Sequence, residues 1–333
     1  PRAAVDEAVA QARRFGRASA AGFVNAVLRN ATRNPDPTTV DPAVRWSHPP
    51  ELLNRFIQLT DDPAQLQAFC RHNNSEPPTI LLLAEGVAPE SLAAPGISLI
   101  PHAEGHRLYV AQPAPRKALL AEWASRGVAQ VQDPTAAGVV SKMDIQPGMT
   151  ILDRCCGRGT KTLQMAAATG RGGRVFAMDC NAARCQALRQ ALAHRALDHV
   201  GVIEASRLVD ASVVLPQQFD RVLVDAPCSN SGVLARRPEA RYRQNDQALE
   251  ELTRLQAFLL ADSAPAVRPG GLLVYSTCSI WPEENDRQVE AFLRENREFE
   301  LVESIRRLPH SEPDPTRYHD GGFTAVLRRR GPD

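Results

Sequence analysis

Apolar strand-like runs alternate with helix-length segments from Gln132 almost to the end of the chain, and this alternation constrains the fold more than any other feature. Such a pattern is typical of a doubly wound parallel sheet, in which helices pack on the sheet between successive strands. An antiparallel hairpin at the sheet edge is compatible with the last two runs. The pattern predicts strands over Thr150–Asp153, Arg174–Met178, Val200–Ile203, Phe219–Val224, Leu272–Tyr275, Glu300–Val302 and Gly322–Leu327, and helices over Thr135–Met143, Leu163–Ala168, Ala182–Ala196, Asp246–Ala264 and Glu283–Asn296.

Two polar motifs follow two of these strands directly. The first is Asp225-Ala226-Pro227-Cys228-Ser229 and the second is Tyr275-Ser276-Thr277-Cys278-Ser279, with one helix-length segment between them. A strand, a crossover helix and a second strand place two parallel strands side by side, with their carboxyl ends at one rim. Cys228 and Cys278 are therefore expected to face one pocket, at the rim where open α/β sheets usually bind ligands.

The chain before this region has two further parts. Its 333 residues suggest two or three domains, on a prior of about 150 residues each. Residues 1–33 have helical spacing of apolar side chains, and Asn34-Pro35-Asp36-Pro37 breaks that pattern as a linker. Residues 43–128 alternate short helices and strands, which suggests a small α+β module. We therefore expect three domains, at residues 1–36, 37–129 and 130–333. In the middle part we expect helices from Leu52 and Pro63, strands over Thr79–Leu83, Ile97–Ile100 and Leu108–Val110, and a helix over Pro115–Ser125.

Composition excludes several classes of protein. The seven cysteines are odd in number and irregularly spaced, so they do not form a disulfide framework. There is no Cys-x-x-Cys and no Cys/His pair at zinc spacing, so no metal is expected, and reduced thiols favour the cytoplasm. No run approaches the roughly 18 apolar residues of a membrane span. The net charge of +1 predicts no partner by itself. The chain begins at Pro1, without Met or a signal segment, as a fragment would.

The loop after the first strand of the sheet contains Gly157 and Gly159, which let the backbone approach a ligand. Gly-x-Gly-x-x-Gly is absent and the spacing to Lys161 is wrong for a P-loop, which weakens dinucleotide and nucleoside triphosphate interpretations. Asp179 ends the second strand, where it would either bind ribose hydroxyls or cap the following helix. Such a loop followed by such an acid suits a mononucleoside such as S-adenosylmethionine.

The two cysteines after strand ends differ from the others in what they can do. A buried cysteine usually packs as a small hydrophobe, which suits Cys70, Cys180 and Cys185. A thiolate can instead add to C6 of a pyrimidine, which makes C5 nucleophilic toward a methyl donor. A carboxylate beside the ring and a second thiol for release complete that chemistry.

These motifs resemble those of a known family. Asp225-Ala226-Pro227-Cys228-Ser229 with Asn230-Ser231-Gly232 resembles the fourth motif of the RNA 5-methylcytosine methyltransferases of the Sun (NSUN) group, and Tyr275 to Ile280 followed by Pro282-Glu283-Glu284-Asn285 resembles their sixth. Within the group, the chain is most similar to the bacterial 16S rRNA enzymes. The resemblance covers nearly the whole chain. Further matching stretches are Phe15-Gly16, Gly22 to Arg29, Trp46-Ser47-His48-Pro49, Asn73-Asn74 with Pro77-Pro78, and Val131-Gln132-Asp133.

The resemblance implies a fold, a cofactor and a set of roles. The fold would be a class I S-adenosylmethionine-dependent methyltransferase, Rossmann-like with a mostly parallel sheet, after a small α+β RNA-recognition module and a remnant of a NusB-like helical domain. It would be a monomer that acts on RNA, with rRNA as the expected substrate. Cys278 would attack C6, Cys228 would assist release and Asp225 would hold the cytosine edge. Asp153 and the following residues would lie in the S-adenosylmethionine site: Cys155, Cys156, Gly157, Arg158, Gly159, Thr160, Lys161, Asp179, Glu204 and Asp225. The RNA would meet Pro227, Arg236, Arg237 and Arg241.

The cofactor motifs depart from the family pattern. The first motif of the family usually reads Asp-x-Cys-Ala-Ala-Pro-Gly-Gly-Lys, whereas this chain has Arg158 and Thr160 in place of the proline and the second glycine. The acid expected near the adenine corresponds to Ala205, one residue after Glu204. A second interpretation is therefore a non-catalytic RNA-binding or ribosome-assembly factor with a degenerate cofactor site. A nicotinamide-dependent oxidoreductase is disfavoured by the missing glycine fingerprint.

Overall fold

The computed structural model describes residues 2–15, 18–33, 41–92, 94–105, 107–205, 216 and 218–331. These residues form two compact units, Pro1–Ser47 and His48–Asp333. The predicted boundary between residues 36 and 37, like the predicted linker Asn34-Pro35-Asp36-Pro37, lies outside the described residues. The predicted boundary between residues 129 and 130 falls inside the second unit and stays a prediction.

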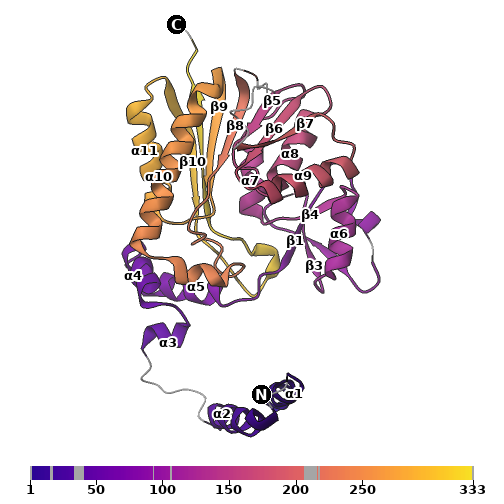
Figure 1. Ribbon diagram of the computed structural model, residues 1–333, viewed down its shortest axis with the longest axis vertical. Coiled ribbons are helices and arrows are strands. Elements are labelled where there is room, and N and C mark those ends of the chain that lie inside the picture. The colour runs from indigo at the N-terminus through magenta and orange to yellow at the C-terminus, as the bar shows by residue number, and fades with distance from the viewer. Residues whose placement is uncertain are drawn as a thin grey trace. The chain divides into compact units, whose positions relative to one another are not determined.

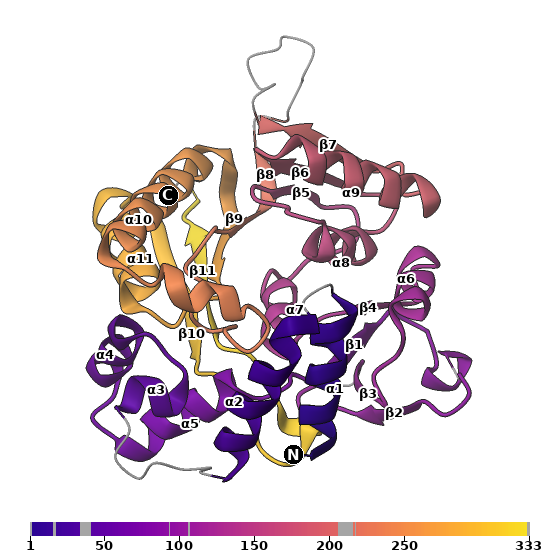
Figure 2. The ribbon, with the colours of Figure 1, turned by 60° about the horizontal axis from the view of Figure 1, so that its bottom comes forward.

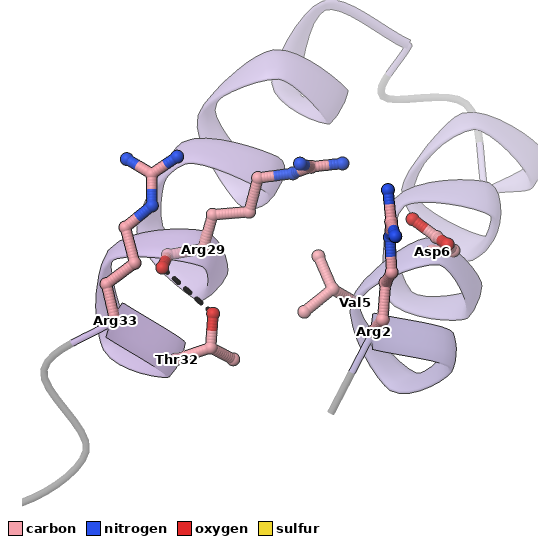
Figure 3. Close-up of a pocket in the computed structure, with 6 residues that line it drawn as sticks. All are labelled: Arg2, Val5, Asp6, Arg29, Thr32 and Arg33. Atoms are coloured by element: carbon pink, nitrogen blue, oxygen red, sulfur yellow. Dashed lines mark hydrogen bonds between the residues drawn. The ribbon is translucent and has the colours of Figure 1, made fainter.

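The first unit is helical, as predicted. Helices α1 (Arg2–Arg14) and α2 (Ala21–Arg33) lie side by side, and a 3₁₀ turn, η1 (Ala18–Ala20), precedes α2. The short helix α3 (Pro42–Trp46) begins after Asp41, whose side chain accepts a hydrogen bond from the backbone N–H of Ala43. A hollow with a volume of about 340 Å³ lies between α1 and α2. Figure 3 shows the residues that line it, which are Arg2, Val5, Asp6, Arg29, Thr32 and Arg33.

The second unit begins with a small antiparallel sheet in the strand order β2-β3-β1-β4. Side chains of β1 alternate between two faces: Ile80 packs with Val110 and Tyr318, and Leu81 packs with Trp123. The elements are α4 (Pro50–Leu59), α5 (Pro63–Asn73), β1 (Thr79–Leu83), η2 (Pro89–Leu92), β2 (Ser98–Pro101), β3 (Leu108–Gln112), α6 (Lys117–Ser125) and β4 (Ala129–Val131).

A seven-stranded sheet follows, in the order β10-β11-β9-β8-β5-β6-β7. The five strands from β9 to β7 in this order are parallel, and β10 and β11 pair antiparallel at one edge, as the sequence predicts. The strands are β5 (Thr150–Asp153), β6 (Arg174–Asp179), β7 (Val200–Glu204), β8 (Phe219–Asp225), β9 (Val267–Thr277), β10 (Phe299–Arg307) and β11 (Gly322–Arg329).

Helices cover both faces of this sheet, and two hydrophobic cores result. Successive residues of a strand point to opposite faces, so Val222 and Val224 pack under α10 and α11, whereas Leu223 packs under α7, α8 and α9. Figures 1 and 2 show α10 and α11 on one side of the sheet and α8 and α9 on the other. The helices are α7 (Pro134–Ser141), α8 (Thr160–Thr169), α9 (Ala182–His194), α10 (Asp246–Ser263) and α11 (Asp286–Glu295), with 3₁₀ turns η4 (Pro238–Arg243), η5 (Ala264–Ala266), η6 (Pro282–Glu284) and η7 (Pro315–Arg317).

The prediction of a helix over Glu283–Asn296 is wrong about the residue at which the helix begins. Helix α11 begins at Asp286, because Asn285 has φ −120° and ψ −103°, outside the helical region. The side chain of Asn285 accepts from the Thr277 hydroxyl at 2.6 Å and donates to the Ser279 carbonyl at 2.9 Å. These bonds turn the chain back over the end of β9 before the helix starts.

Among the helices in the described ranges, none combines the length and the apolar composition needed to cross a bilayer.

Candidate active site

The predicted site segments converge at one rim of the large sheet. Strands β5, β6, β8 and β9 run parallel, so their last residues, Asp153, Asp179, Asp225 and Thr277, lie along the same edge. Strands β8 and β9 are direct neighbours, with Asp225 opposite Ser276. The loops that carry Cys228 and Cys278 therefore leave the sheet side by side.

The two cysteines meet, as the sequence predicts. Their Sγ atoms are 3.0 Å apart and both thiols are free. Cys278 Sγ also lies 3.3 Å from Asn230 Oδ1, to which it donates. The hydrogen bond with Cys278, together with burial, raises the pKa of Cys228 well above its usual range. This shift favours the protonated form of Cys228.

An ion pair lies beside the cysteines. Lys161 Nζ, on the first turn of α8, donates to Asp225 Oδ2 at 2.7 Å, and the Ser276 hydroxyl donates to Asp225 Oδ1 at 2.6 Å. Burial disfavours the charged ammonium, but attraction and hydrogen bonding to Asp225 outweigh burial and raise the pKa of Lys161. The field of Cys278 contributes in the same direction. A cation thus stands within electrostatic reach of Cys278.

Asn230 and Gly232 shape the loop after Cys228. Asn230 has φ +61°, in the left-handed region that asparagine tolerates better than most residues, and its Nδ2 donates to the Cys228 carbonyl at 2.9 Å. A Cβ at Gly232 would lie 2.5 Å from the Gly321 carbonyl oxygen, so this position requires glycine. Neither residue is among the predicted site residues, although both belong to the motif that carries the resemblance.

The loop from Asp153 to Lys161 is held by Asp179. One carboxylate oxygen of Asp179 accepts from the backbone N–H of Gly157 at 2.9 Å, and the other accepts from the N–H of Asn181 at 2.8 Å. Asn181, not Asp179, caps α9, since its side chain accepts from Arg184 N. The structure thus decides against the helix-cap alternative for Asp179, and its proposed contact with ribose remains open to test.

The buried carboxyl of Asp153 indicates that a ligand binds at this rim of the sheet. Its carboxyl is buried, and Oδ2 accepts from the Thr162 hydroxyl at 2.6 Å, but Oδ1 has no protein donor at normal hydrogen-bond geometry. Buried polar atoms are rarely left unpaired, so a donor on a bound molecule is the expected partner. With the positive-φ glycines Gly157 and Gly159 beside it, this loop fits S-adenosylmethionine.

Asp153 also makes stability depend on pH. Burial is the largest cause that raises its pKa, from 3.8 to about 7. A carboxyl whose pKa is higher in the folded than in the unfolded protein makes its full contribution to stability below the unfolded pKa of 3.8. That contribution falls as the pH rises and is lost as the pH passes about 7. We expect Asp153→Asn, which cannot ionise, to gain about 3 kcal/mol of unfolding free energy relative to the unsubstituted protein between about pH 5 and about pH 8. Urea unfolding of both proteins measures this, and parallel pH profiles would contradict it.

Gly159 is the position of this loop that is most sensitive to an added side chain. Its φ is +86°, and a Cβ there would lie 2.3 Å from Cδ1 of Leu188, which is fully buried. Gly159→Ala should therefore lower the unfolding free energy by about 2–4 kcal/mol and weaken S-adenosylmethionine binding.

Gly157 provides the matched control for that substitution. It has φ +55°, and no heavy atom lies within 4 Å of the position that an added methyl group would take. Gly157→Ala should therefore cost about 1–2 kcal/mol through backbone strain alone. Denaturant unfolding and titration calorimetry with S-adenosylmethionine compare the two variants. Equal losses in both would refute the steric argument.

The other predicted cofactor residues occupy varied positions. Burial is the largest cause that raises the pKa of Cys155, to about 12, and of Cys156 further, so both are inert thiols that pack beside the loop. Arg158 is exposed and Thr160 begins α8. Glu204 ends β7 opposite Asp179, and Ala205 packs on the core under α10.

Of the three predicted RNA-binding arginines, Arg241 is buried, Arg236 is half-buried and Arg237 is exposed. Arg236 Nε donates to Asp320 Oδ2 at 2.6 Å, and its guanidinium lies over the Tyr318 ring. Arg241 is 8% exposed and donates to the carbonyl of Asn73 and to the Asn74 side chain. These two arginines connect the chain after Cys228 to other parts of the unit. Arg237, with a side chain that is 62% exposed, is the one of the three that lies open to a phosphate.

Pro227 and several polar groups complete the surroundings of the cysteines. The Pro227 carbonyl accepts from Gln256 Nε2 at 2.9 Å, which fixes the loop just before Cys228. The sequence prediction does not include Glu284, Ser229 or Ser279, which bond to one another between the two loops. The motif Pro282-Glu283-Glu284-Asn285 is a signal for Glu284, but it does not indicate what the carboxylate touches. Within the described ranges, no group of three or more His, Cys, Asp and Glu side chains is placed to hold a metal ion.

Comparisons with known proteins agree with this arrangement. Residues 140–322 match the family model described as 16S rRNA methyltransferase RsmB/F, and residues 1–33 match the NusB family model. The chain is similar to ribosomal RNA small subunit methyltransferase B of Serratia proteamaculans (strain 568), 33% identical over 321 residues, which are 92% of this chain and 72% of that protein. The protein of the same name from Yersinia pseudotuberculosis (strain IP 31758) is 33% identical over 346 residues, 99% of this chain and 78% of that protein.

Solved structures share the fold. A methyltransferase homolog protein from Pyrococcus horikoshii superposes with a TM-score of 0.63 at 20% identity, over 84% of this chain and 99% of that one. NSun6 from Pyrococcus horikoshii, solved with SFG, gives a TM-score of 0.68 at 17% identity, over 84% of this chain and 98% of that one. At such identities the likeness concerns the fold, and it confirms the predicted Rossmann-like methyltransferase architecture.

Proposed function

Because the chain belongs to the RsmB/F family of 16S rRNA methyltransferases, which use S-adenosylmethionine, we propose that it methylates C5 of a cytosine in 16S rRNA through a covalent bond between Cys278 and C6. The observation that carries this proposal is the pair of thiols at the rim, with Sγ atoms 3.0 Å apart. A single thiol would suffice for attack, whereas a second thiol in contact with the first suits a reaction that must also release its product.

Attack begins with Cys278. The raised pKa of Cys228 disfavours loss of its proton, so we assign the attack to Cys278, whose thiol gives its proton to water. The thiolate Sγ forms a bond to C6, and the electron pair of the C5–C6 double bond moves so that C5 becomes nucleophilic. Asp225, held by Lys161 and Ser276, accepts a hydrogen bond from the amino edge of the cytosine and fixes the ring. S-adenosylmethionine, bound along the Asp153–Lys161 loop, supplies an electrophilic methyl group to C5.

Release reverses the addition. The C5 proton passes to water, the electrons of the C5–H bond restore the C5–C6 double bond, and the C6–Sγ bond breaks. The sulfur of Cys278 leaves as a thiolate, and Cys228 donates its hydrogen bond to that sulfur. The Cys278 thiolate then takes a proton back from water, so the chain returns to its starting protonation state with 5-methylcytosine as the product and one proton released for each methyl group.

The test uses the purified chain, 16S rRNA and S-adenosylmethionine labelled in the methyl group. Nuclease digestion followed by chromatography should place the label in 5-methylcytidine. Label in any other nucleoside would sink the proposal, and so would no label with free rRNA and with assembled or partly assembled small subunits.

The rival interpretation, a non-catalytic RNA-binding or assembly factor, draws on Arg158, Thr160 and Ala205 in the cofactor region. Titration calorimetry separates it from the enzyme. Binding of S-adenosylmethionine at micromolar affinity would remove the non-catalytic interpretation. The cytoplasm and a monomeric state remain predictions from the sequence.

A further inference from the structure

A fully buried carboxylate lies between the two cysteine loops. Glu284, the last residue of η6, has 0% exposed surface. Its Oε1 accepts from the backbone N–H of Ser229 at 2.8 Å and from Gln256 Nε2 at 3.0 Å. Its Oε2 accepts from the hydroxyl of Ser229 at 2.5 Å and from the hydroxyl of Ser279. Both oxygens are thus fully used as acceptors inside the protein.

The partners of Glu284 have a common position in the sequence. Ser229 directly follows Cys228, and Ser279 directly follows Cys278, and the two serine hydroxyls are 3.2 Å apart. Gln256, from α10, also donates to the carbonyl of Pro227, the residue before Cys228. One carboxylate therefore ties together the residues next to both thiols.

The two loops depend on Glu284 to different degrees. Each loop also has a bond that does not involve Glu284, because the Cys228 carbonyl accepts from Asn230 Nδ2 and the Ser279 carbonyl accepts from Asn285 Nδ2. The Cys228 loop donates two hydrogen bonds to Glu284, from the N–H and the hydroxyl of Ser229, whereas the Cys278 loop donates one, from the hydroxyl of Ser279. Removing the carboxylate should therefore displace Cys228 more than Cys278.

We propose that Glu284 is a positioning residue that sets the place of Cys228 against Cys278 and so controls product release. This rests on the proposed function, in which Cys278 attacks and Cys228 assists the departure of the Cys278 sulfur. Glu284 touches neither substrate nor reacting atom in this scheme. It acts through the backbone and hydroxyl of Ser229, and its loss should leave attack largely intact while release slows.

The experiment measures the covalent RNA adduct and the release of methylated RNA separately. Purified Glu284→Gln, 16S rRNA and labelled S-adenosylmethionine are mixed, and denaturing gels follow the protein–RNA adduct over time. We expect adduct to form within about threefold of the unsubstituted rate and to disappear about 10- to 100-fold more slowly, because a misplaced catalytic group costs rates of this order. Combining Cys228→Ala with Glu284→Gln should slow release no further than Cys228→Ala alone.

Glu283→Gln is the matched control. It makes the same chemical change one residue earlier in η6, where the carboxylate pairs with Arg287 and is 33% exposed. This variant should form and release adduct at the unsubstituted rates. Ser229→Ala provides a second, milder test, since it removes one bond to Glu284 and keeps the backbone bond, and it should slow release in the same direction.

Each outcome decides between supporting and overturning the inference. Slow release in Glu284→Gln with near-normal attack supports it. A proportional fall in attack and release without trapped adduct, or no change in either, overturns it. If Glu284→Gln does not fold, Ser229→Ala decides: normal release overturns the inference. If Cys228→Ala traps no adduct, the proposed function itself fails. If Cys228→Ala traps adduct and neither Glu284→Gln nor Ser229→Ala does, only the role of Glu284 is wrong.

Discussion

Cys278→Ala should abolish methyl transfer, with a loss of about 10⁴-fold or more, because removing a covalent nucleophile removes the reaction path and not merely a contact. The same variant should give no covalent RNA adduct. The assignment depends on which thiol loses its proton first. The pKa of Cys228 is raised by its bond to Cys278 and by burial, whereas Cys278 lies within the field of the Lys161 ammonium. The raised pKa of Cys228 disfavours its ionisation, which leaves Cys278 as the proposed nucleophile.

The measurement for this variant combines methyl incorporation into 16S rRNA with a denaturing gel for the adduct. Cys180→Ala is a suitable control, since Cys180 is an exposed free cysteine outside the pair and should keep full activity. Urea unfolding checks that Cys278→Ala remains folded. Adduct formation by Cys278→Ala, or activity above about 1% of the unsubstituted protein, would show that another group attacks C6.

The close approach of the two thiols can be predicted from the sequence, because it follows from the general connection rules of parallel β-sheets. A strand, a helix and a strand form a right-handed crossover between neighbouring parallel strands, so the residues after β8 and β9 emerge together. The sequence places both Lys161 and Asp225 in the site but does not predict that they pair. Their loops follow different strands, and the sequence does not specify how far a long side chain reaches between them.

Which charged residues are buried is much harder to predict. The sequence predicts that Arg236 meets RNA, yet it bonds to Asp320 and lies 3.6 Å from Asp133, in a contact between residues far apart in the chain. The predicted helix places Glu284 in its first turn, where an acidic residue is common. The burial of Glu284 comes from Ser229, Ser279 and Gln256, which local periodicity cannot reveal. Long-range polar contacts of this kind leave no pattern in a single sequence.

Cys228→Ala should behave in the opposite way to Cys278→Ala and trap the enzyme on its RNA. Without the thiol, the departing sulfur of Cys278 loses the donor that lies 3.0 Å away, so the C6–Sγ bond breaks more slowly. We expect attack and a first methyl transfer to persist, while turnover falls by about 10²- to 10³-fold and adduct accumulates in proportion to enzyme. A burst of one methyl group per protein, followed by a slow phase, is the kinetic sign.

Together, the two substitutions test whether Cys278 attacks and Cys228 assists release, or whether the two cysteines have the opposite roles. In the double variant Cys228→Ala/Cys278→Ala the adduct should disappear, because the trapped bond is made by Cys278. If Cys278→Ala traps RNA and Cys228→Ala does not, the roles are reversed, and the raised pKa of Cys228 would then have to be lowered when RNA binds. If neither traps RNA while methylation continues, the close contact of the thiols serves packing and the covalent mechanism fails. We expect the first result, because the raised pKa of Cys228 disfavours its ionisation and Lys161 lies within electrostatic reach of Cys278.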